Sequence, residues 1–368
     1  MTGEKSAVIN HIVTRIKPLD EVAMAACQDR LDNLTKPLNS LGDFEKLAVR
    51  LAGITRQSQP RQLQKSIILM AADHGVAAEG VSAYPSEVTA QMVKNFCNGG
   101  AAINVFAAHV GAELVLVDVG VAADLAALPG LRIEKVAPGT ANMATGPAMT
   151  RQQALAAIEI GITVACEQIT QGVQVIGLGE MGIGNTTPST AIVAAYSDLP
   201  LEKLTGRGTG ITDSAWQHKI RVIRESLTVN CLDKADPLDV LTKVGGLEIA
   251  GLTGVVLAAA AHSTAVVLDG LNTSAAALIA CQMNPLVKGY LIGSHLSVEP
   301  AHLEALRMME VSAYLKLDMR LGEGTGAALG MSLIDAGLHM LGDMKTFGEA
   351  QVATAQDGPG ALRQKRDS

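Results

Sequence analysis

Short apolar runs alternate with longer alanine-rich segments of helical period along the middle of this chain, and this alternation restricts the fold more than any other feature. Apolar residues at successive positions are typical of strands in a parallel sheet that helices cover on both faces. The longer segments supply the crossover connections that parallel strands need. We therefore predict an α/β protein with an open, mostly parallel, doubly wound sheet. The predicted strands are residues 66–70, 114–117, 173–176, 265–268 and 289–292, and the clearest helices are 151–168, 212–227, 247–262 and 274–281.

The two ends of the chain differ from this central pattern. The residues before the first predicted strand indicate helices only, with a turn-rich stretch at 35–42 between them. A further helix is expected at 301–317, where it would pack with the N-terminal helices. The predicted parts are a large Rossmann-like domain for nucleotide and base binding at 66–300, a small helical, site-closing unit from 1–65 with 301–348, and a polar, frayed tail at 349–368.

The composition excludes several classes of partner. The 29 basic and 36 acidic residues give a formal charge of −7, and no Lys/Arg run is interleaved with aromatic residues. Nucleic acid and anionic membrane surfaces are therefore not expected partners. The longest apolar stretch, residues 249–261, is shorter than the roughly 20 residues that span a bilayer. The chain is expected to act on small molecules.

The cysteines indicate a reducing compartment. Their number, 5, is odd, and they are widely spaced without a CxxC pair or a Cys/His cluster. The N-terminus leads into an amphipathic segment instead of an apolar signal core. We expect buried thiols, a cytoplasmic protein, and neither a metal nor a cofactor.

A glycine-rich loop after the third predicted strand is a candidate phosphate site. Residues 177–188 read GLGEMGIGNTTP, so Gly182 and Gly184 allow backbone N–H groups to approach an anion. Asn185 and Thr186 lead into Thr187 and Pro188, which fit the first positions of a helix. Many glycine-rich turns bind nothing, and this one is neither a Walker A sequence nor an opening dinucleotide motif.

A second glycine loop and a lysine strengthen that interpretation. Residues 206–210 read GRGTG, including Gly208, and precede a helix that carries Lys219. A lysine about two turns into a helix can point back at the same anion as a charge-assisted donor. A solvated lysine on the helix face is the competing interpretation.

Polar residues follow other predicted strands. Asp269 and Gly270 follow the fourth strand, where the carboxylate would bind a ribose hydroxyl or cap the next helix. Gly293 and Ser294 follow the last strand and would contact a substrate carboxylate. The Asp73-His74 pair points its side chains apart and lacks further ligands, so we interpret it as a structural polar site.

Residues 320–326, RLGEGTG, hold one carboxylate among three glycines before a helix. With little side-chain bulk around it, Glu323 would allow a flat substrate to lie against it and act as a general base. A solvated glutamate in a glycine turn is the alternative.

Several motifs in one order resemble a known family. They are residues 36–42 (KPLNSLG), 72–76 (ADHGV), 179–187 (GEMGIGNTT), 244–246 (VGG) and 320–326 (RLGEGTG). Together they resemble nicotinate-nucleotide:dimethylbenzimidazole phosphoribosyltransferase over about residues 34–341. The resemblance implies transfer of ribose 5-phosphate from nicotinate mononucleotide to a benzimidazole nitrogen, in cobalamin nucleotide-loop assembly, by a homodimer.

The resemblance also implies roles for single residues. Glu323 would remove the N–H proton of the benzimidazole, and Glu180 would contact the ribose or assist that base. The 5′-phosphate would be anchored by a set of loop residues and one lysine, namely Gly182, Gly184, Asn185, Gly208, Gly270 and Lys219.

The base pocket departs from some family members. They have Ser before the proline of segment 81–85 and Gln further on, where this chain has Tyr84 and Met92. With Met181 and Leu321, these side chains suit a bicyclic or monocyclic aromatic ring, and Tyr84 could hydrogen-bond a substituent. Two other functions stay open: a mononucleotide hydrolase in which Glu323 activates water, and a noncatalytic nucleotide sensor.

Overall fold

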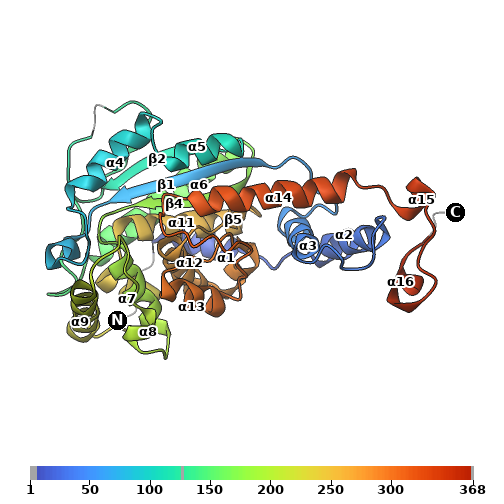
Figure 1. Cartoon of the computed structure of the whole chain (residues 1–368). Coiled ribbons are helices and arrows are strands. Elements are labelled where there is room, and N and C mark those ends of the chain that lie inside the picture. The colour runs from blue at the N-terminus through green and yellow to red at the C-terminus, as the bar shows by residue number, and fades with distance from the viewer. Residues whose placement is uncertain (1–5, 126–127, 366–368) are drawn as a thin grey trace.

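The computed structural model describes residues 6–125 and 128–365, and within these ranges a six-stranded parallel sheet forms the centre of the molecule (Figure 1). The strands are β1 (Gln64–Ala72), β2 (Glu113–Gly120), β3 (Leu131–Ile133), β4 (Val173–Met181), β5 (Ala265–Val267) and β6 (Leu291–Ile292). Their order is β3-β2-β1-β4-β5-β6, and every adjacent pair is parallel. The order reverses between β1 and β4, as in doubly wound nucleotide-binding folds. The predicted fold class is confirmed.

Helices cover both faces of the sheet, which explains the continuous apolar runs. In β1, Ile67 and Ile68 point to opposite faces, and both are fully buried. One face carries α4 (Glu87–Cys97), α5 (Ala102–His109) and α14 (Thr325–Asp343); the other carries α11 (Leu247–Ala261), which packs along α6 (Arg151–Thr170). No helix in the described ranges is long and apolar enough to cross a membrane.

The predicted helices begin where their capping residues stand. At the start of α6, Thr150 Oγ1 accepts from the N–H of Gln153 at 3.1 Å, and Gln153 Oε1 accepts from the N–H of Thr150 at 2.8 Å. These reciprocal bonds satisfy two N–H groups that a helix terminus leaves free. At the start of α9 (Asp213–Asn230), Thr212 Oγ1 accepts from the N–H of Ala215 at 3.4 Å. The prediction of 151–168 and 212–227 as helices is confirmed.

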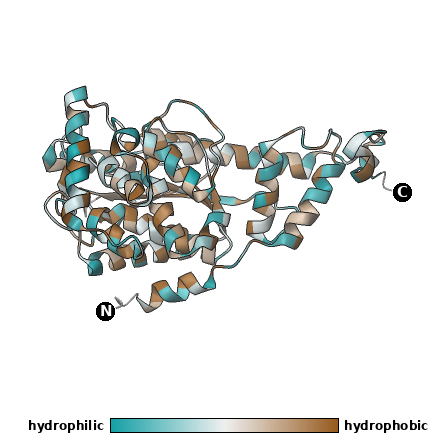
Figure 2. Cartoon of the chain, turned by 90° about the horizontal axis from the view of Figure 1, so that it is seen from below, coloured by the Kyte–Doolittle hydropathy of each residue, from teal (hydrophilic) through white to brown (hydrophobic). Residues whose placement is uncertain are grey.

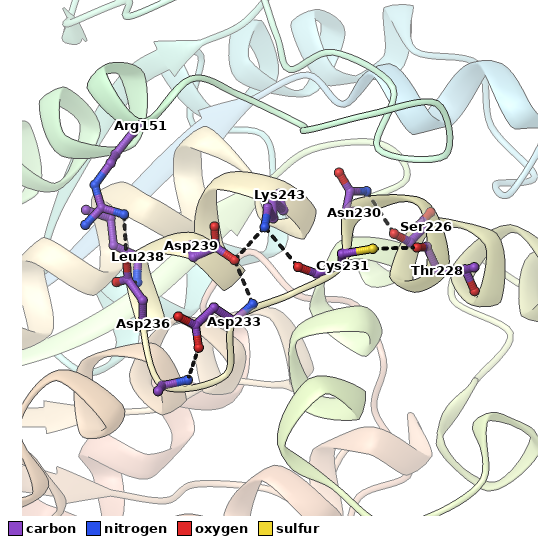
Figure 3. Close-up of polar contacts among 11 residues, drawn as sticks. Arg151, Ser226, Thr228, Asn230, Cys231, Asp233, Asp236, Leu238, Asp239 and Lys243 are labelled. Atoms are coloured by element: carbon purple, nitrogen blue, oxygen red, sulfur yellow. Dashed lines mark hydrogen bonds and ion pairs between the residues drawn. The ribbon is translucent and has the colours of Figure 1, made fainter. Parts of the chain in front are cut away.

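The connection from α9 to α10 (Pro237–Val244) is held by side chains (Figure 3). Asp236 caps α10 by accepting from the N–H of Leu238 at 3.1 Å, and its other oxygen pairs with Arg151 at 2.7 Å. Lys243 donates to Asp239 at 2.9 Å and to the carbonyl of Cys231 at 3.0 Å. These contacts fix the far end of α9, the helix that carries Lys219.

The N-terminal region is helical, as predicted, with α1 (Ala7–Arg15), α2 (Glu21–Asn33) and α3 (Asp43–Thr55). Figure 2 shows the N-terminal helix lying along the large α/β part, where α1 packs on α11, with the C-terminus at the opposite end of the molecule. Helices α2 and α3 pack with the end of α14 around a separate apolar cluster that consists of Cys27, Leu31, Leu34, Ala48, Ala52 and Leu341. The division at residues 65/66 and 300/301 stays a prediction.

The structure corrects three local expectations. Helix α13 (Pro300–Met309) ends at Glu310, whose φ of 59° breaks the helix, so the helix predicted at 301–317 is too long. It packs against α12 (Leu271–Met283), α7 (Thr186–Tyr196) and α8 (Leu201–Leu204). The following Tyr314 and Leu315 line a pocket together with residues of α3. The strand expected at 289–292 begins two residues later, after the 3₁₀ turn η2 (Pro285–Tyr290), and β3 was not predicted.

The C-terminal segment, expected to be frayed, is docked over its described part. After α15 (Phe347–Ala350) and α16 (Gly358–Arg363), the backbone N–H of Lys365 donates to Asn33 at 2.7 Å, and Gln364 donates to the carbonyl of Lys36 at 3.2 Å. The contacts are polar, in agreement with the polar composition. The last predicted tail residues, 366–368, lie outside the described ranges.

Candidate active site

A cavity of about 370 Å³ opens at the carboxyl ends of the strands, around the reversal between β1 and β4. Loops from the two halves of a doubly wound sheet diverge at that point, which leaves room for a ligand. The walls come from segments that follow β1, β4, β5 and β6 and from the turn before α14. The predicted site residues that line it are Tyr84, Met92, Glu180, Met181, Gly182, Gly184, Asn185, Thr186, Gly208, Gly270, Leu321 and Glu323.

Four predicted site residues stand behind the wall. Lys219 Nζ donates to Thr186 Oγ1 at 2.7 Å. Ser294 donates its hydroxyl to the carbonyl of Leu268 at 2.6 Å, and Gly293 packs against the backbone of Ser312. Neither Gly293 nor Ser294 lines the cavity, so neither residue is placed to contact a substrate directly.

Asp269, the fourth, holds the turn that carries Glu323. Its two carboxylate oxygens accept from the N–H of Gly324 at 3.0 Å and of Gly326 at 2.7 Å. These groups belong to the first turn of α14, so Asp269 caps that helix and not the one that follows it in sequence. The expectation that Asp269 caps α12 is therefore wrong, because the helix that it caps lies far along the chain.

Glu323 sits on a strained turn. It has a φ of 64°, between Gly322 at 85° and Gly324 at 92°. Three successive residues in the left-handed region suit glycine, while for a glutamate that conformation costs roughly 1 kcal/mol. A Cβ at residue 322 would overlap the carboxylate of Glu180. The turn therefore holds Glu323 at the cavity and close to Glu180.

The carboxylate of Glu323 is buried but weakly held. The side chain is part of a residue that is only 6% exposed, and its Oε2 accepts from the N–H of Ile103 at 3.4 Å. Burial raises the pKa of Glu323, the N–H of Ile103 lowers it, and the charge of Asp269 raises it further. A carboxylate with few donors and a raised pKa is a stronger proton acceptor than a solvated one.

Glu180 lies at the end of β4, buried in the cavity wall. Asn185 donates its amide to the Glu180 carboxylate, and Asn272 donates to Asn185 Oδ1 at 3.0 Å. Burial raises the pKa of Glu180 to about 8; the amides of Asn272 and Asn185 oppose this shift, and the charges of Asp269 and Glu248 add to it. The carboxyl group is therefore largely protonated at neutral pH.

At the other end of the cavity, a cation and an acid lie close to Gly208. Lys219 is fully buried, and burial lowers its pKa to about 8 although the charge of Glu299 opposes the shift. Glu299 accepts from the N–H of Gly208 at 2.8 Å. Gly208, which we expected to anchor the phosphate, thus has its N–H bonded to a carboxylate.

The mouth of the cavity is apolar. Tyr84 is 55% exposed and Leu321 is 58% exposed, and Met92 and Met181 lie partly buried beside them. Burying such side chains under a flat ring would release their apolar surface from water. This end suits an aromatic molecule, while the Lys219 end suits an anion.

The Asp73-His74 pair is structural, as predicted. His74 Nε2 lies 2.7 Å from Glu248 Oε1 in the core, and Asp73 accepts from the N–H of Ala122 at 2.8 Å. Burial opposes protonation of His74, but the charges of Glu248, Asp73 and Glu180 outweigh it and raise its pKa. Within 6–125 and 128–365, no group of three or more His, Cys, Asp or Glu residues is placed to hold a metal ion.

Sequence reasoning assigned no role to several wall residues, chiefly Asn272, Ser297 and Glu299. Ser297 and Glu299 follow β6 and precede Pro300, the first residue of α13. A polar pair between a strand end and a helix start lies where ligands bind in such sheets, and that position was the available signal. Asn272 lies where a predicted loop leads into a helix, and no sequence motif marks it as a site residue.

The chain belongs to a family of phosphoribosyltransferases. The family described as "Phosphoribosyltransferase" matches residues 16–352, nearly the whole chain. Two relatives named nicotinate-nucleotide–dimethylbenzimidazole phosphoribosyltransferase narrow this class. The protein from Geobacter sulfurreducens is 52% identical over 346 residues, which are 94% of this chain and 98% of its own length. The protein from Geotalea uraniireducens is 53% identical over 349 residues, 95% and 99% of the two chains.

A solved structure agrees with this membership. CobT from Thermus thermophilus superposes with a TM-score of 0.87 and 43% sequence identity, covering 90% of this chain and 99% of the other. The resemblance drawn from the motifs is confirmed.

Proposed function

We propose that this protein transfers ribose 5-phosphate from nicotinate mononucleotide to 5,6-dimethylbenzimidazole or a related aromatic base. The products would be nicotinate and α-ribazole 5′-phosphate, in cobalamin nucleotide-loop assembly. The proposal rests on the arrangement of one cavity. Its apolar mouth and Glu323 lie at one end, and Lys219 lies behind the wall at the other end. The names of the relatives that cover nearly the whole chain support it.

The reaction joins one ring nitrogen of the acceptor to the anomeric carbon as the bond from that carbon to nicotinate breaks. The bonding pair returns to the pyridinium nitrogen, so the leaving group becomes neutral in its ring. The acceptor would become cationic unless its other nitrogen loses a proton, and Glu323 takes that proton. A placed general base contributes about 10²–10⁴-fold in rate, and alignment of the nitrogen with the carbon contributes further.

The nucleotide would be held at the polar end. Gly182, Gly184, Asn185 and Thr186 would line one side of the nucleotide, and Gly208 and Gly270 would close the site. Lys219 contributes the positive charge. Glu180, largely protonated, would donate a hydrogen bond to the ribose or assist Glu323.

The acceptor would lie in the mouth, on Tyr84 and Met92, with Met181 and Leu321 along its edges. The tyrosine hydroxyl is available to a ring substituent. Related benzimidazoles and single-ring aromatics are therefore included in the proposal.

The assembly and location are part of the same proposal. We infer a cytoplasmic homodimer of two-part chains, with the large domain at 66–300 and the small unit from 1–65 with 301–348. Light-scattering mass at working concentration measures the assembly, and a monomer would refute the dimer.

Product analysis tests the function. The purified protein is incubated with nicotinate mononucleotide, with and without 5,6-dimethylbenzimidazole, and the products are separated and weighed by mass spectrometry. Equal amounts of nicotinate and α-ribazole phosphate, formed only with acceptor, are expected. Nicotinate without acceptor would indicate the hydrolase, and binding without any product would indicate the sensor.

A further inference from the structure

The phosphate end of the cavity contains an acid, Glu299, at the start of α13. Its Oε1 accepts from the N–H of Gly208 at 2.8 Å. Its Oε2 is buried and has no hydrogen-bond partner among the described residues. A Cβ at residue 206 would overlap this carboxylate, so glycine at that position makes room for it. The loop and the acid are therefore built around each other.

Glu299 shares its surroundings with the groups that would bind an anion. A Cβ on Gly208 would lie 2.8 Å from Thr186 Oγ1 and 3.4 Å from Lys219 Nζ, so these groups meet within one side-chain length. Thr186, Gly208 and Glu299 all line the cavity. An anion that reaches Thr186 and the lysine consequently comes close to a carboxylate with a free acceptor.

Two negative groups in one buried site repel each other unless a proton lies between them. Sulfate carries no proton near neutral pH, whereas a phosphate group can carry one, because its second pKa is about 6. A phosphate O–H can donate to Oε2 of Glu299 while its other oxygens accept from Thr186 and the lysine.

We propose that Glu299 is a specificity-determining residue which admits an oxyanion only with a hydrogen on the oxygen that faces it. The cavity would thus take a phosphomonoester as its monoanion and reject sulfate. This inference rests on the proposed function, since it adds an acid to the phosphate site of the same reaction.

The other charged groups around Glu299 bond to partners other than its carboxylate. Arg320 donates to the carbonyl of Gly208 at 3.0 Å, and Arg207 pairs with Asp213. His295 lies 3.4 Å from Asp269.

One further neighbour is neutral. His302 accepts at Nδ1 from the N–H of Ser297, and burial, with the charge of His295, lowers its pKa to about 3. Two cations remain near the anion: Arg320, which lines the cavity, and Lys219, which lies behind Thr186. Their attraction acts on phosphate and sulfate alike.

The test compares inorganic phosphate with sodium sulfate as competitors of nicotinate mononucleotide, measured as dissociation constants on the full-length protein at one pH. The wild type should prefer phosphate by roughly ten- to a hundredfold, the range that one hydrogen bond to a charged group provides. In Glu299→Gln the amide oxygen still accepts from Gly208, but the amide nitrogen donates to either anion. The preference should then fall at least tenfold, mainly through tighter sulfate binding.

Glu304→Gln is the matched control. Glu304 lies on α13, which Glu299 precedes; it is similarly buried, and it bonds Ser197 and Arg307 away from the cavity. It should keep the wild-type preference.

Equal affinity of the wild type for the two anions would overturn the inference without any variant. An unchanged preference in Glu299→Gln would do the same, and in both cases turnover of nicotinate mononucleotide would leave the proposed function standing. If neither anion nor nucleotide bound, the phosphate site itself would be wrong and both proposals would fail together.

Discussion

The end of β4 and the turn before α14 each place one glutamate in the same cavity, and they hold it in opposite ways. Glu180 continues a central strand, lines the cavity at 5% exposure, and accepts from the Asn185 amide. Glu323 lies on a turn with positive φ and has one long backbone N–H contact. A protonated carboxyl group can donate a hydrogen bond, and a side-chain amide that donates to it holds it in place. A carboxylate that faces the substrate and has few donors can accept a proton.

Burial alone therefore does not distinguish a catalytic acid from a structural one. Burial raises the pKa of both carboxyl groups. The donors to the two carboxyl groups differ, and we propose that this difference decides which group takes the acceptor proton. Variants of these glutamates and of Lys219 test this difference, and the largest effect is expected at Glu323.

Replacing Glu323 by Gln should lower kcat by about 10²–10⁴-fold, because the proton of the acceptor loses its base. Calorimetric binding of nicotinate mononucleotide should be unchanged, since we propose that the nucleotide binds toward Lys219. Steady-state rates equal to those of the wild type would remove Glu323 from the mechanism.

Replacing Lys219 by Met should weaken nicotinate mononucleotide binding by roughly ten- to a hundredfold, the effect of losing a charge-assisted hydrogen bond. The methionine keeps the apolar stem of the side chain in the core. At saturating nucleotide, kcat should stay within a fewfold of the wild type. A binding isotherm that overlays the wild type would place this lysine outside the phosphate site.

Replacing Glu180 by Gln should stabilise the protein increasingly as the pH rises. In the folded state the pKa of Glu180 is about 8, against an unfolded value near 4.3. Between these values the folded state holds a proton that the unfolded state has lost, so wild-type stability falls with rising pH. The variant lacks this loss, and its advantage should grow by up to about 1.4 kcal/mol per pH unit.

Urea unfolding at pH 5, 6 and 7 measures this advantage. Glu304→Gln is the control: its hydrogen bond with Arg307 lowers the pKa of Glu304, so its effect should be constant above pH 5. An advantage of Glu180→Gln that does not change with pH would show that Glu180 is ionised in the folded protein.

The smallest expected effect is on the pH profile of kcat. The wild type should lose activity as the pH falls through the raised pKa of Glu323, because a protonated base cannot accept. Glu180→Gln mimics the protonated acid and should keep this acidic limb within about half a pH unit, with kcat reduced less than about tenfold. Loss of the limb in that variant would transfer the role of base to Glu180.

Local pattern made much of this fold predictable. The runs in β1 and β4 are buried on both faces, so their composition alone indicates parallel strands. Two residues of β3 are partly buried and the third is exposed, and the strand lies at the sheet edge, where no apolar run is required. The end of α13 at Glu310 depends on a backbone conformation that the sequence does not signal.

The site divides in the same way. The glycine loops and Glu323 could be found because short stretches combine unusual residues. Asp269 caps a helix 55 residues further on, and Glu299 bonds a glycine 91 residues earlier. Such pairings arise from tertiary structure and leave no local pattern.

The central claim is that Glu323, and not Glu180, removes the acceptor proton. Single-turnover rates of Glu323→Gln and Glu180→Gln, with saturating nicotinate mononucleotide and 5,6-dimethylbenzimidazole at one pH near neutrality, test it most directly. The account predicts a loss of about 10²–10⁴-fold for the first variant and less than about tenfold for the second. Equal losses, or the larger loss in Glu180→Gln, would contradict it.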